Sequence, residues 1–440
     1  MLTAFGRAFR TPDLRNKMLF TLGILALFRF GSTVPAPGVN YQHVHDCLIQ
    51  NKDSSVLALV NLFSGGALLQ LTVFALGIMP YITSSIIIQL LVVVIPRLER
   101  LKEQGQSGQA KLTQYTRYLT VALAILQATG IVALARSGRL LPCTDSTGAQ
   151  IDLLYSTSVF RIITLVVTMT AGTAVIMWLG ELITDRGIGN GMSLLIFTSI
   201  AARFPSQGTD ILRSRGTATF IAVLIAGLLI IVGIVFMEQG QRRIPVQYAK
   251  RMIGRRMYGG TSTYIPLKVN QAGVIPVIFS SSLLYLPQLL GQVWTSNHTF
   301  TNFVAKYFTA TDSWTYIGSY ALLTMFFTYF YVAITFNPVE VSDNMRKYGG
   351  FIPGIRPGRP TAEYLEYVLS RITLPGALYL TAIAVLPILA LHFLPGAAAG
   401  NNQSFPFGGT SVLILVGVGL DTSKQIESQL MLRNYEGFLR

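Results

Sequence analysis

The chain has 440 residues, of which 51% are hydrophobic and only 12% are charged, and its mean hydropathy is +0.51. A soluble domain has about twice that share of charged residues, so the composition excludes an ordinary soluble protein. The apolar residues also fall in blocks of about 17–25, the length that crosses a bilayer as a helix. The sequence therefore predicts an all-α polytopic membrane protein.

We expect ten membrane-spanning helices in two inverted halves of five. An odd number of helices in each half gives the two halves opposite orientations in the membrane. The halves are residues 18–205 and 206–424, between an N-terminal segment, 1–17, and a tail, 425–440. The expected spans are 18–36, 73–95, 115–136, 154–177, 188–205, 216–237, 271–293, 315–337, 372–394 and 408–424.

The distribution of basic residues predicts the orientation of these spans. Lys and Arg are enriched in the cytoplasmic loops of membrane proteins. If both termini are cytoplasmic, the great majority of the 34 Lys and Arg residues lie in cytoplasmic segments. We therefore expect cytoplasmic termini.

Two cytoplasmic segments are long and rich in arginine, residues 238–270 and 338–371. The charge alone could be a topology signal. The second segment also contains the run 349–358, whose glycines and prolines predict a rigid loop that is neither helix nor strand and that presents Arg356. We therefore favour docking surfaces for a large acidic partner.

A short apolar segment, residues 57–71, precedes the second span without a polar turn. A helix of this length rises only about 22 Å, which is too little to cross the membrane alone. We expect a half-helix that enters from the outer side. Irregular backbone at membrane depth requires protein or a water-filled cavity around it, so this segment predicts a central cavity.

Several kinds of chemistry have no sequence signal. The chain lacks a phosphate-binding Gly-Lys pair and a His-Glu-x-x-His zinc motif, so neither an enzyme nor a metal or cofactor is expected. The second to tenth spans hold almost no acidic residue, with Asp421 at the end of the last. Ion-coupled transporters usually need carboxylates there, so we expect a partner to supply energy.

Three isolated residues have alternative interpretations. Cys47 and Cys143 both fall in outer segments and allow one bridge, although two free thiols are favoured. Arg29 lies in the outer half of the first span, where a snorkelling or helix-pairing arginine is favoured over a functional gate charge.

Taken together, the motifs of the chain resemble the SecY family, the large subunit of the protein-conducting channel. The resemblance covers essentially the whole chain. Its carriers are Phe28–Ser32, Pro35–Gly38, Leu62–Ala67, Ala75–Ile82, Ser85–Gln89, Arg186–Gly191, Gly240–Pro245, Lys268–Pro276 and the 349–358 loop.

The resemblance implies an hourglass pore between the two halves, closed by an aliphatic ring and by a plug. Pairs of ring positions lie four residues apart, on one face of a helix. Aliphatic side chains offer ions no ligand and tend to dewet a constriction. The implied ring is Ile82, Ile86, Met192, Ile196, Ile278 and Ile414, and the implied plug includes Leu62, Phe63, Ser64, Gly65, Gly66 and Ala67 within 57–71.

The resemblance also implies a lateral gate between the second and seventh spans. Polar contacts between membrane helices average about 0.6 kcal/mol, which suits a seam that must part. The candidate gate residues are Ser84, Ser85, Gln89, Thr120, Asn270, Ser280, Ser281 and Ser282.

The long cytoplasmic segments would dock the ribosome or the SecA motor. The candidate docking residues are Arg242, Arg243, Lys250, Arg251, Arg255, Arg256 and Arg356. Further implied partners are the small subunits SecE and SecG, signal sequences, nascent polypeptides and membrane lipid.

The expected function is a passive channel in the bacterial cytoplasmic membrane. It would translocate unfolded secretory polypeptides and release transmembrane segments sideways into lipid. Two alternatives remain open, an inverted-repeat solute transporter and a membrane insertase without a pore.

Overall fold

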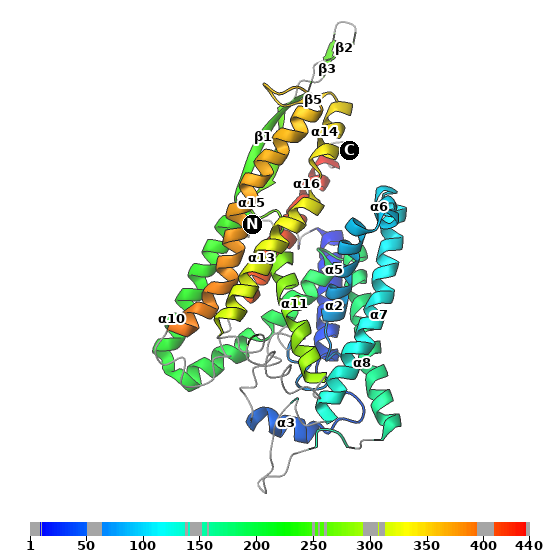
Figure 1. The fold of residues 1–440 in the computed structure, drawn as a ribbon, viewed down its shortest axis with the longest axis vertical. Coiled ribbons are helices and arrows are strands. Elements are labelled where there is room, and N and C mark those ends of the chain that lie inside the picture. Colours follow the sequence, from blue (N-terminus) through cyan, green and yellow to red (C-terminus); the bar gives the residue numbers. More distant parts are fainter. Residues whose placement is uncertain are drawn as a thin grey trace.

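The computed structural model describes residues 9, 11–50, 64–136, 140, 152–155, 158–248, 251–253, 256–258, 262–293, 307, 313–393 and 409–436. Helices dominate this part of the chain (Figure 1). The N-terminal half contains α2 (Pro12–Gly31), α3 (Tyr41–Gln50), α5 (Met79–Val94), α6 (Pro96–Glu103), α7 (Gln106–Arg136), α8 (Val159–Arg186) and α9 (Gly191–Ala201). The C-terminal half contains α10 (Phe204–Gln239), α11 (Ile275–Val293), α13 (Trp314–Thr335), α14 (Pro338–Lys347), α15 (Arg359–Phe393) and α16 (Gly409–Glu436).

Each of the ten expected spans overlaps one of these helices. By length and composition, five helices in the described residues can cross a membrane, or six if the bent pair α5–α6 is one span. The class of multi-pass helical membrane protein is thus observed, while the count of ten spans stays a prediction.

Prolines set several helix boundaries. Pro80 lies in the first turn of α5, and Pro276 lies in the first turn of α11. The first turn tolerates proline because its N–H groups have no partner within the helix. Residues 73–78, expected in the second span, form turns instead. Pro96 begins α6, which is bent by 101° from α5.

The half-helix expected at 57–71 is wrong for its described part. Residues 64–71 form consecutive turns, and the backbone is left-handed at Gly65 (φ 68°), Gly66 (φ 96°) and Leu71 (φ 47°). An α-helix cannot include such residues. Residues 57–63 lie outside the described part of the chain.

The two long segments that were expected to be cytoplasmic both contribute to one small sheet, and the second segment also contains α14 and the start of α15. Strands β1 (Gln241–Tyr248) and β4 (Ser262–Lys268) pair antiparallel, and β5 (Gly350–Phe351) pairs with the other edge of β1. The run 349–358 therefore contains a strand, contrary to expectation. A second hairpin joins β2 (Arg251–Ile253) to β3 (Arg256–Tyr258) and extends from the end of the molecule opposite α3 (Figure 1).

This sheet has a hydrophobic core of its own. Ile244 and Val246 alternate with exposed neighbours along β1, as expected for a strand with one buried face. They pack with Leu267 of β4, with Ile352, which follows β5, and with Leu365 of α15. The described parts of the two segments thus pack together as one folded unit.

The buried apolar residues described in the membrane part form three large clusters, and two of these each lie within one half of the chain. One cluster lies within the N-terminal half, and another joins α10, α11, α13, α15 and α16 of the C-terminal half. A third, here called the central cluster, joins the two halves. Its buried members are Ile24, Phe28, Phe74, Ile78, Met79, Ile176, Leu179, Ile183, Leu194, Leu195, Ile196, Ile200, Ile278, Ile414 and Val418.

Glycine allows the segment before α5 to lie directly on α8. A Cβ atom at Gly172 would lie 2.1 Å from the carbonyl oxygen of Val73. That backbone cannot move freely, because the N–H of Val73 donates to the carbonyl of Val34 at 3.0 Å.

We therefore expect Gly172→Ala to destabilise the protein by about 1–3 kcal/mol, the usual cost of overpacking. Thermal unfolding of the purified protein measures this. Gly318→Ala in α13 is the matched control, since a Cβ there meets nothing within 4 Å. Equal unfolding temperatures for the two variants would contradict the close contact.

Candidate pore, plug and lateral gate

Most of the expected ring residues meet where the two halves join. Ile196 of α9, Ile278 of α11 and Ile414 of α16 are buried members of the central cluster. Ile82 of α5 and Met192 of α9 pack against it. Aliphatic side chains from four helices and from both halves therefore form one apolar contact.

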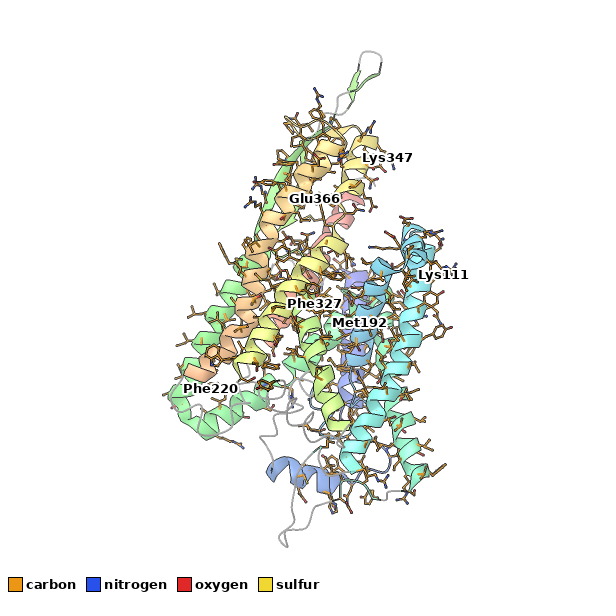
Figure 2. The ribbon with its side chains drawn as sticks, viewed as in Figure 1. Lys111, Met192, Phe220, Phe327, Lys347 and Glu366 are labelled. Atoms are coloured by element: carbon orange, nitrogen blue, oxygen red, sulfur yellow. The ribbon has the colours of Figure 1, made fainter. Side chains whose placement is uncertain are left out.

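One expected ring residue lies outside the central cluster, and another packs in it against α8. Ile86, one turn after Ile82, is half-buried but is not part of the central cluster. Met192 lies near the middle of the molecule (Figure 2), but its thioether packs on α8. A Cβ atom at Gly180 would lie 2.4 Å from the sulfur of Met192.

The described part of the expected plug, residues 64–71, lies against α2 and α9. Arg29 of α2 donates from Nη1 to the carbonyl oxygen of Gly65 at 2.9 Å. On the other side, a Cβ atom at Gly65 would lie 3.3 Å from the Cα of Ser199 in α9. Ser64, Ala67 and the following Leu68 are almost fully buried. Leu62 and Phe63 lie outside the described residues.

The end of this segment is anchored to the chain that follows α2. The N–H of Ala36 donates to the carbonyl of Leu71 at 3.1 Å, and the N–H of Val73 donates to that of Val34 at 3.0 Å. Leu71 and Leu68 pack in the cluster of the N-terminal half. The segment is thus tied at its end, while its start meets the central helices.

The expectation that Cys47 is a free thiol is wrong. It is fully buried beside Leu68 and Leu71 in the cluster of the N-terminal half, and it is disulfide-bonded. The only other cysteine of the chain is Cys143, which lies outside the described residues.

The expected gate lies where α11 contacts both α5 and α7. The candidate hydroxyl groups there bond within their own helices. Ser84 donates to the carbonyl of Pro80 at 2.7 Å, and Thr120 donates to that of Thr116 at 2.7 Å. Gln89 is exposed and its amide reaches only Ser85, at 3.5 Å. No hydrogen bond recorded among the described residues joins α11 to α5 or α7.

Some candidate gate residues of the C-terminal half bond within that half. Ser280 accepts from Thr324 of α13 at 3.1 Å, and both are fully buried. Asn270 precedes α11 and donates to the carboxylate of Glu238 at the end of α10.

The two neighbouring serines also have no recorded contact across the seam. Ser281 bonds the carbonyl of Ile278 at 2.9 Å, and the buried hydroxyl of Ser282 has no recorded partner. The hydrogen bonds recorded for the candidate gate residues in the described part of the chain therefore all stay within one half.

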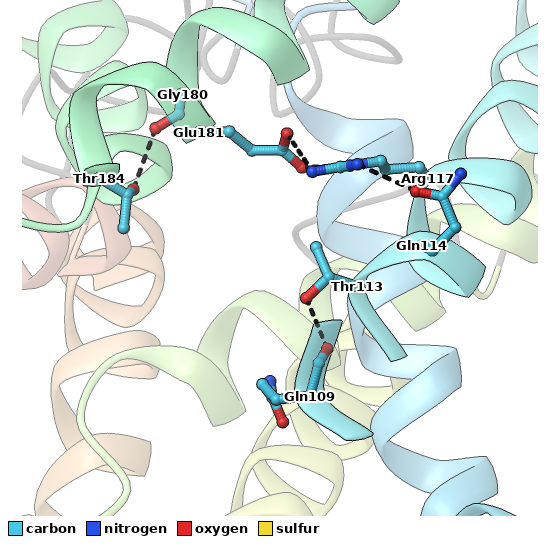
Figure 3. A network of polar contacts seen from close by, with 7 residues as sticks. All are labelled: Gln109, Thr113, Gln114, Arg117, Gly180, Glu181 and Thr184. Carbon is cyan, nitrogen blue, oxygen red and sulfur yellow. Dashed lines mark hydrogen bonds and ion pairs between the residues drawn. The ribbon is translucent and has the colours of Figure 1, made fainter. Parts of the chain in front are cut away.

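A strong ion pair behind the gate was missed by the sequence analysis. Arg117 of α7 donates from Nε and Nη2 to the two carboxylate oxygens of Glu181 in α8, at 2.8 Å each, and from Nη1 to Gln114 at 2.9 Å (Figure 3). Thr184, one turn further on α8, accepts from the N–H of Gly191 in α9 at 2.9 Å. These contacts join α7, α8 and α9. An Arg and a Glu at the facing ends of consecutive antiparallel helices is the signal that could have revealed the pair.

The expected docking residues that the structure describes lie on β1, on the β2–β3 hairpin and in the run 349–358. Arg242 and Arg243 are exposed on β1, and Arg243 stacks over the ring of Tyr264 at 4.8 Å. Arg251 and Arg256 lie on β2 and β3, whereas Lys250 and Arg255 lie outside the described residues.

The backbone around Arg356 is held in place. Arg356 is exposed, and its carbonyl accepts from the hydroxyl of Thr361 at 2.8 Å. The carbonyl of Gly358 accepts from the buried hydroxyl of Ser342 in α14 at 2.7 Å. The loop therefore presents Arg356 from a fixed base.

The fold and the site define a multi-pass helical membrane protein with an apolar cluster where its two halves meet. Among the described residues, no group of His, Cys, Asp and Glu side chains could hold a metal ion.

Comparison with known proteins identifies the family. The family model for SecY matches residues 72–423. A curated relative, the protein translocase subunit SecY of Mycobacterium bovis, is 62% identical over the full length of both chains. The chain belongs to the SecY family.

Solved structures share the fold at low sequence identity. A structure described as a protein-conducting channel has a TM-score of 0.64 at 16% identity and covers 94% of this chain and 91% of its own. The Sec61 channel from a canine ribosome-channel complex has a TM-score of 0.61 at the same identity and the same coverage.

The central cluster leads to a test of the ring. Ile278 in the cluster and Ile317 in the core of the C-terminal half are equally exposed, at 6%. We expect serine at either position to lower stability, because each substitution removes buried apolar surface. Only Ile278→Ser should also raise the ion conductance of resting channels in planar bilayers. A conductance rise in both variants, or in neither, would sink the assignment of Ile278 to the ring.

Proposed function

We propose that the chain forms the channel of a protein translocase, which passes unfolded secretory polypeptides across the membrane and releases apolar segments into lipid. The observation that carries this proposal is the central cluster, in which aliphatic side chains of both halves meet. The 64–71 segment approaches α9 at Ser199, one turn from the cluster residue Ile196. Membership in the SecY family supports the same reading.

The aliphatic side chains of the central cluster are suited to forming a seal around a translocating polypeptide. Ile196, Ile278 and Ile414 have no polar atom in their side chains, so they offer a hydrated ion no substitute for its water shell. They also make no directional contact that must be broken when a chain displaces them. The constriction can therefore widen around side chains of different size and close again.

Lateral release requires a seam that opens at modest cost. The boundary of α11 with α5 and α7 suits this, because the candidate hydroxyl groups bond within their own helices or their own half. Parting the helices then breaks apolar contacts, and a hydrophobic segment or lipid can replace those contacts directly.

The work of translocation comes from partners, since we propose no catalytic centre in this chain. The sheet of β1, β4 and β5 and the Arg356 loop are the proposed docking surfaces for the ribosome or for the SecA ATPase. A Sec61 channel of the same fold is known in a ribosome-channel complex. SecE and SecG are the proposed small subunits, and the proposed location is the bacterial cytoplasmic membrane. The distribution of Lys and Arg supports cytoplasmic termini.

Reconstitution separates this function from its alternatives. Purified translocase complex in liposomes should import an unfolded secretory protein when its motor is supplied, and it should not move small solutes on its own. Uptake of a small solute without any partner would favour a transporter. Membrane insertion without secretion would favour a pore-less insertase.

Docking leads to a test at Arg356. We expect Arg356→Glu to abolish most secretory translocation while leaving thermal stability unchanged, because the side chain is exposed and its reversed charge would repel an acidic partner. Binding of the wild-type complex to ribosomes should weaken as salt is raised.

The matched control is Arg136→Glu, the same change of charge at the exposed outer end of α7. Normal secretion by Arg356→Glu, or equal loss in both variants, would remove the docking role of Arg356.

A further inference from the structure

Arg29 is a charged residue whose place in the fold the channel function does not explain. It lies on α2 in the outer half of the first span and is half-buried. Within the described residues its acceptors are the carbonyl of Gly65, at 2.9 Å, and the hydroxyl of Ser32, at 3.4 Å. Arginine at membrane depth is costly, so its partners are seldom accidental.

The backbone of Gly65 is held closely on both sides. A Cβ atom there would lie 3.2 Å from Nη1 of Arg29 and 3.3 Å from the Cα of Ser199, and φ is 68°. Ser199 is one turn beyond the ring residue Ile196 on α9. The carbonyl of Gly65 is thus placed beside the central cluster, and Arg29 is the charged donor that meets it.

A second arginine lies beside the same turn. A Cβ atom at Gly66 would lie 3.7 Å from Nε and Nη2 of Arg203, at the junction of α9 and α10. Arg29 beside Gly65 and Arg203 beside Gly66 thus bring two positive charges to the same turn. The negative end of a carbonyl dipole near two positive charges lowers their mutual repulsion. If the turn moved away, this compensation would be lost.

We propose that Arg29 is the residue that retains the plug in the resting channel, through its hydrogen bond to the carbonyl of Gly65. This rests on the proposed channel function. Arg29 sets the balance between closed and open channels, and a signal sequence must overcome that balance by binding the open state more tightly. Without this bond the channel opens with less help from a signal.

The ion conductance of the translocase complex without substrate measures the fraction of channels whose plug is retained. We expect Arg29→Gln to raise resting conductance about tenfold, the effect of losing one hydrogen bond from a charged donor. Arg29→Lys keeps a charged donor and should stay within about twofold of wild type. Arg161→Gln is the matched control, since it neutralises another arginine of the membrane part, one that is exposed on α8.

Thiol labelling in membranes measures how accessible the plug is. It can also be applied to variants that are unstable in detergent. Ala67 is buried, with 1% of its surface exposed, so Ala67→Cys should react slowly with an impermeant reagent added from outside. Combining it with Arg29→Gln should speed the reaction and relax the signal requirement for translocation.

Equally slow labelling of Ala67→Cys with and without Arg29→Gln, or wild-type conductance of the folded Arg29→Gln complex, would overturn the proposal. If the wild-type complex itself failed to translocate, the channel function would fail instead.

Discussion

The two halves of this protein meet through an aliphatic contact, and the rest of the account depends on that contact. Ile196 of the first half packs with Ile278 and Ile414 of the second half in one cluster. The side chains of these three residues have no polar atoms, so no hydrogen bond or ion pair joins them. Apolar contacts are non-directional, so they can be lost and regained without a fixed geometry. The proposed constriction could therefore open and close reversibly.

Directional contacts lie elsewhere and keep each half intact. The bidentate pair of Arg117 with Glu181 joins α7 to α8, and the bond between Thr184 and Gly191 continues to α9. In the other half, Thr324 of α13 bonds Ser280 of α11. This division of strong contacts within halves and apolar contacts between them is what a hinged pair of rigid bodies requires.

The sequence predicted the features that hydrophobicity and motifs determine, and it missed those that depend on distant partners. Blocks of apolar residues located ten helices, and the motif resemblance brought Ile82, Ile196, Ile278 and Ile414 together. The alternation of Ile244 and Val246 could have revealed β1, but the charges around it favoured a loop. The turns at Gly65 and Gly66 replaced an expected half-helix because that segment packs on α2 and α9.

Other features depend on packing that no local pattern carries. Met192 shares a helical face with Ile196, yet its sulfur fills the space left by Gly180 on the neighbouring helix. Cys47 is buried in the cluster of the N-terminal half, so its bonded state depends on chain segments far apart in sequence.

A photocrosslinker at position 278, in complexes holding a secretory chain stalled halfway across the membrane, tests the central claim most directly. The account predicts a crosslink to the stalled chain at position 278 and none at position 317, which is equally buried but lies outside the central cluster. A crosslink at 317, or none at 278 while the chain is demonstrably spanning the membrane, would contradict it.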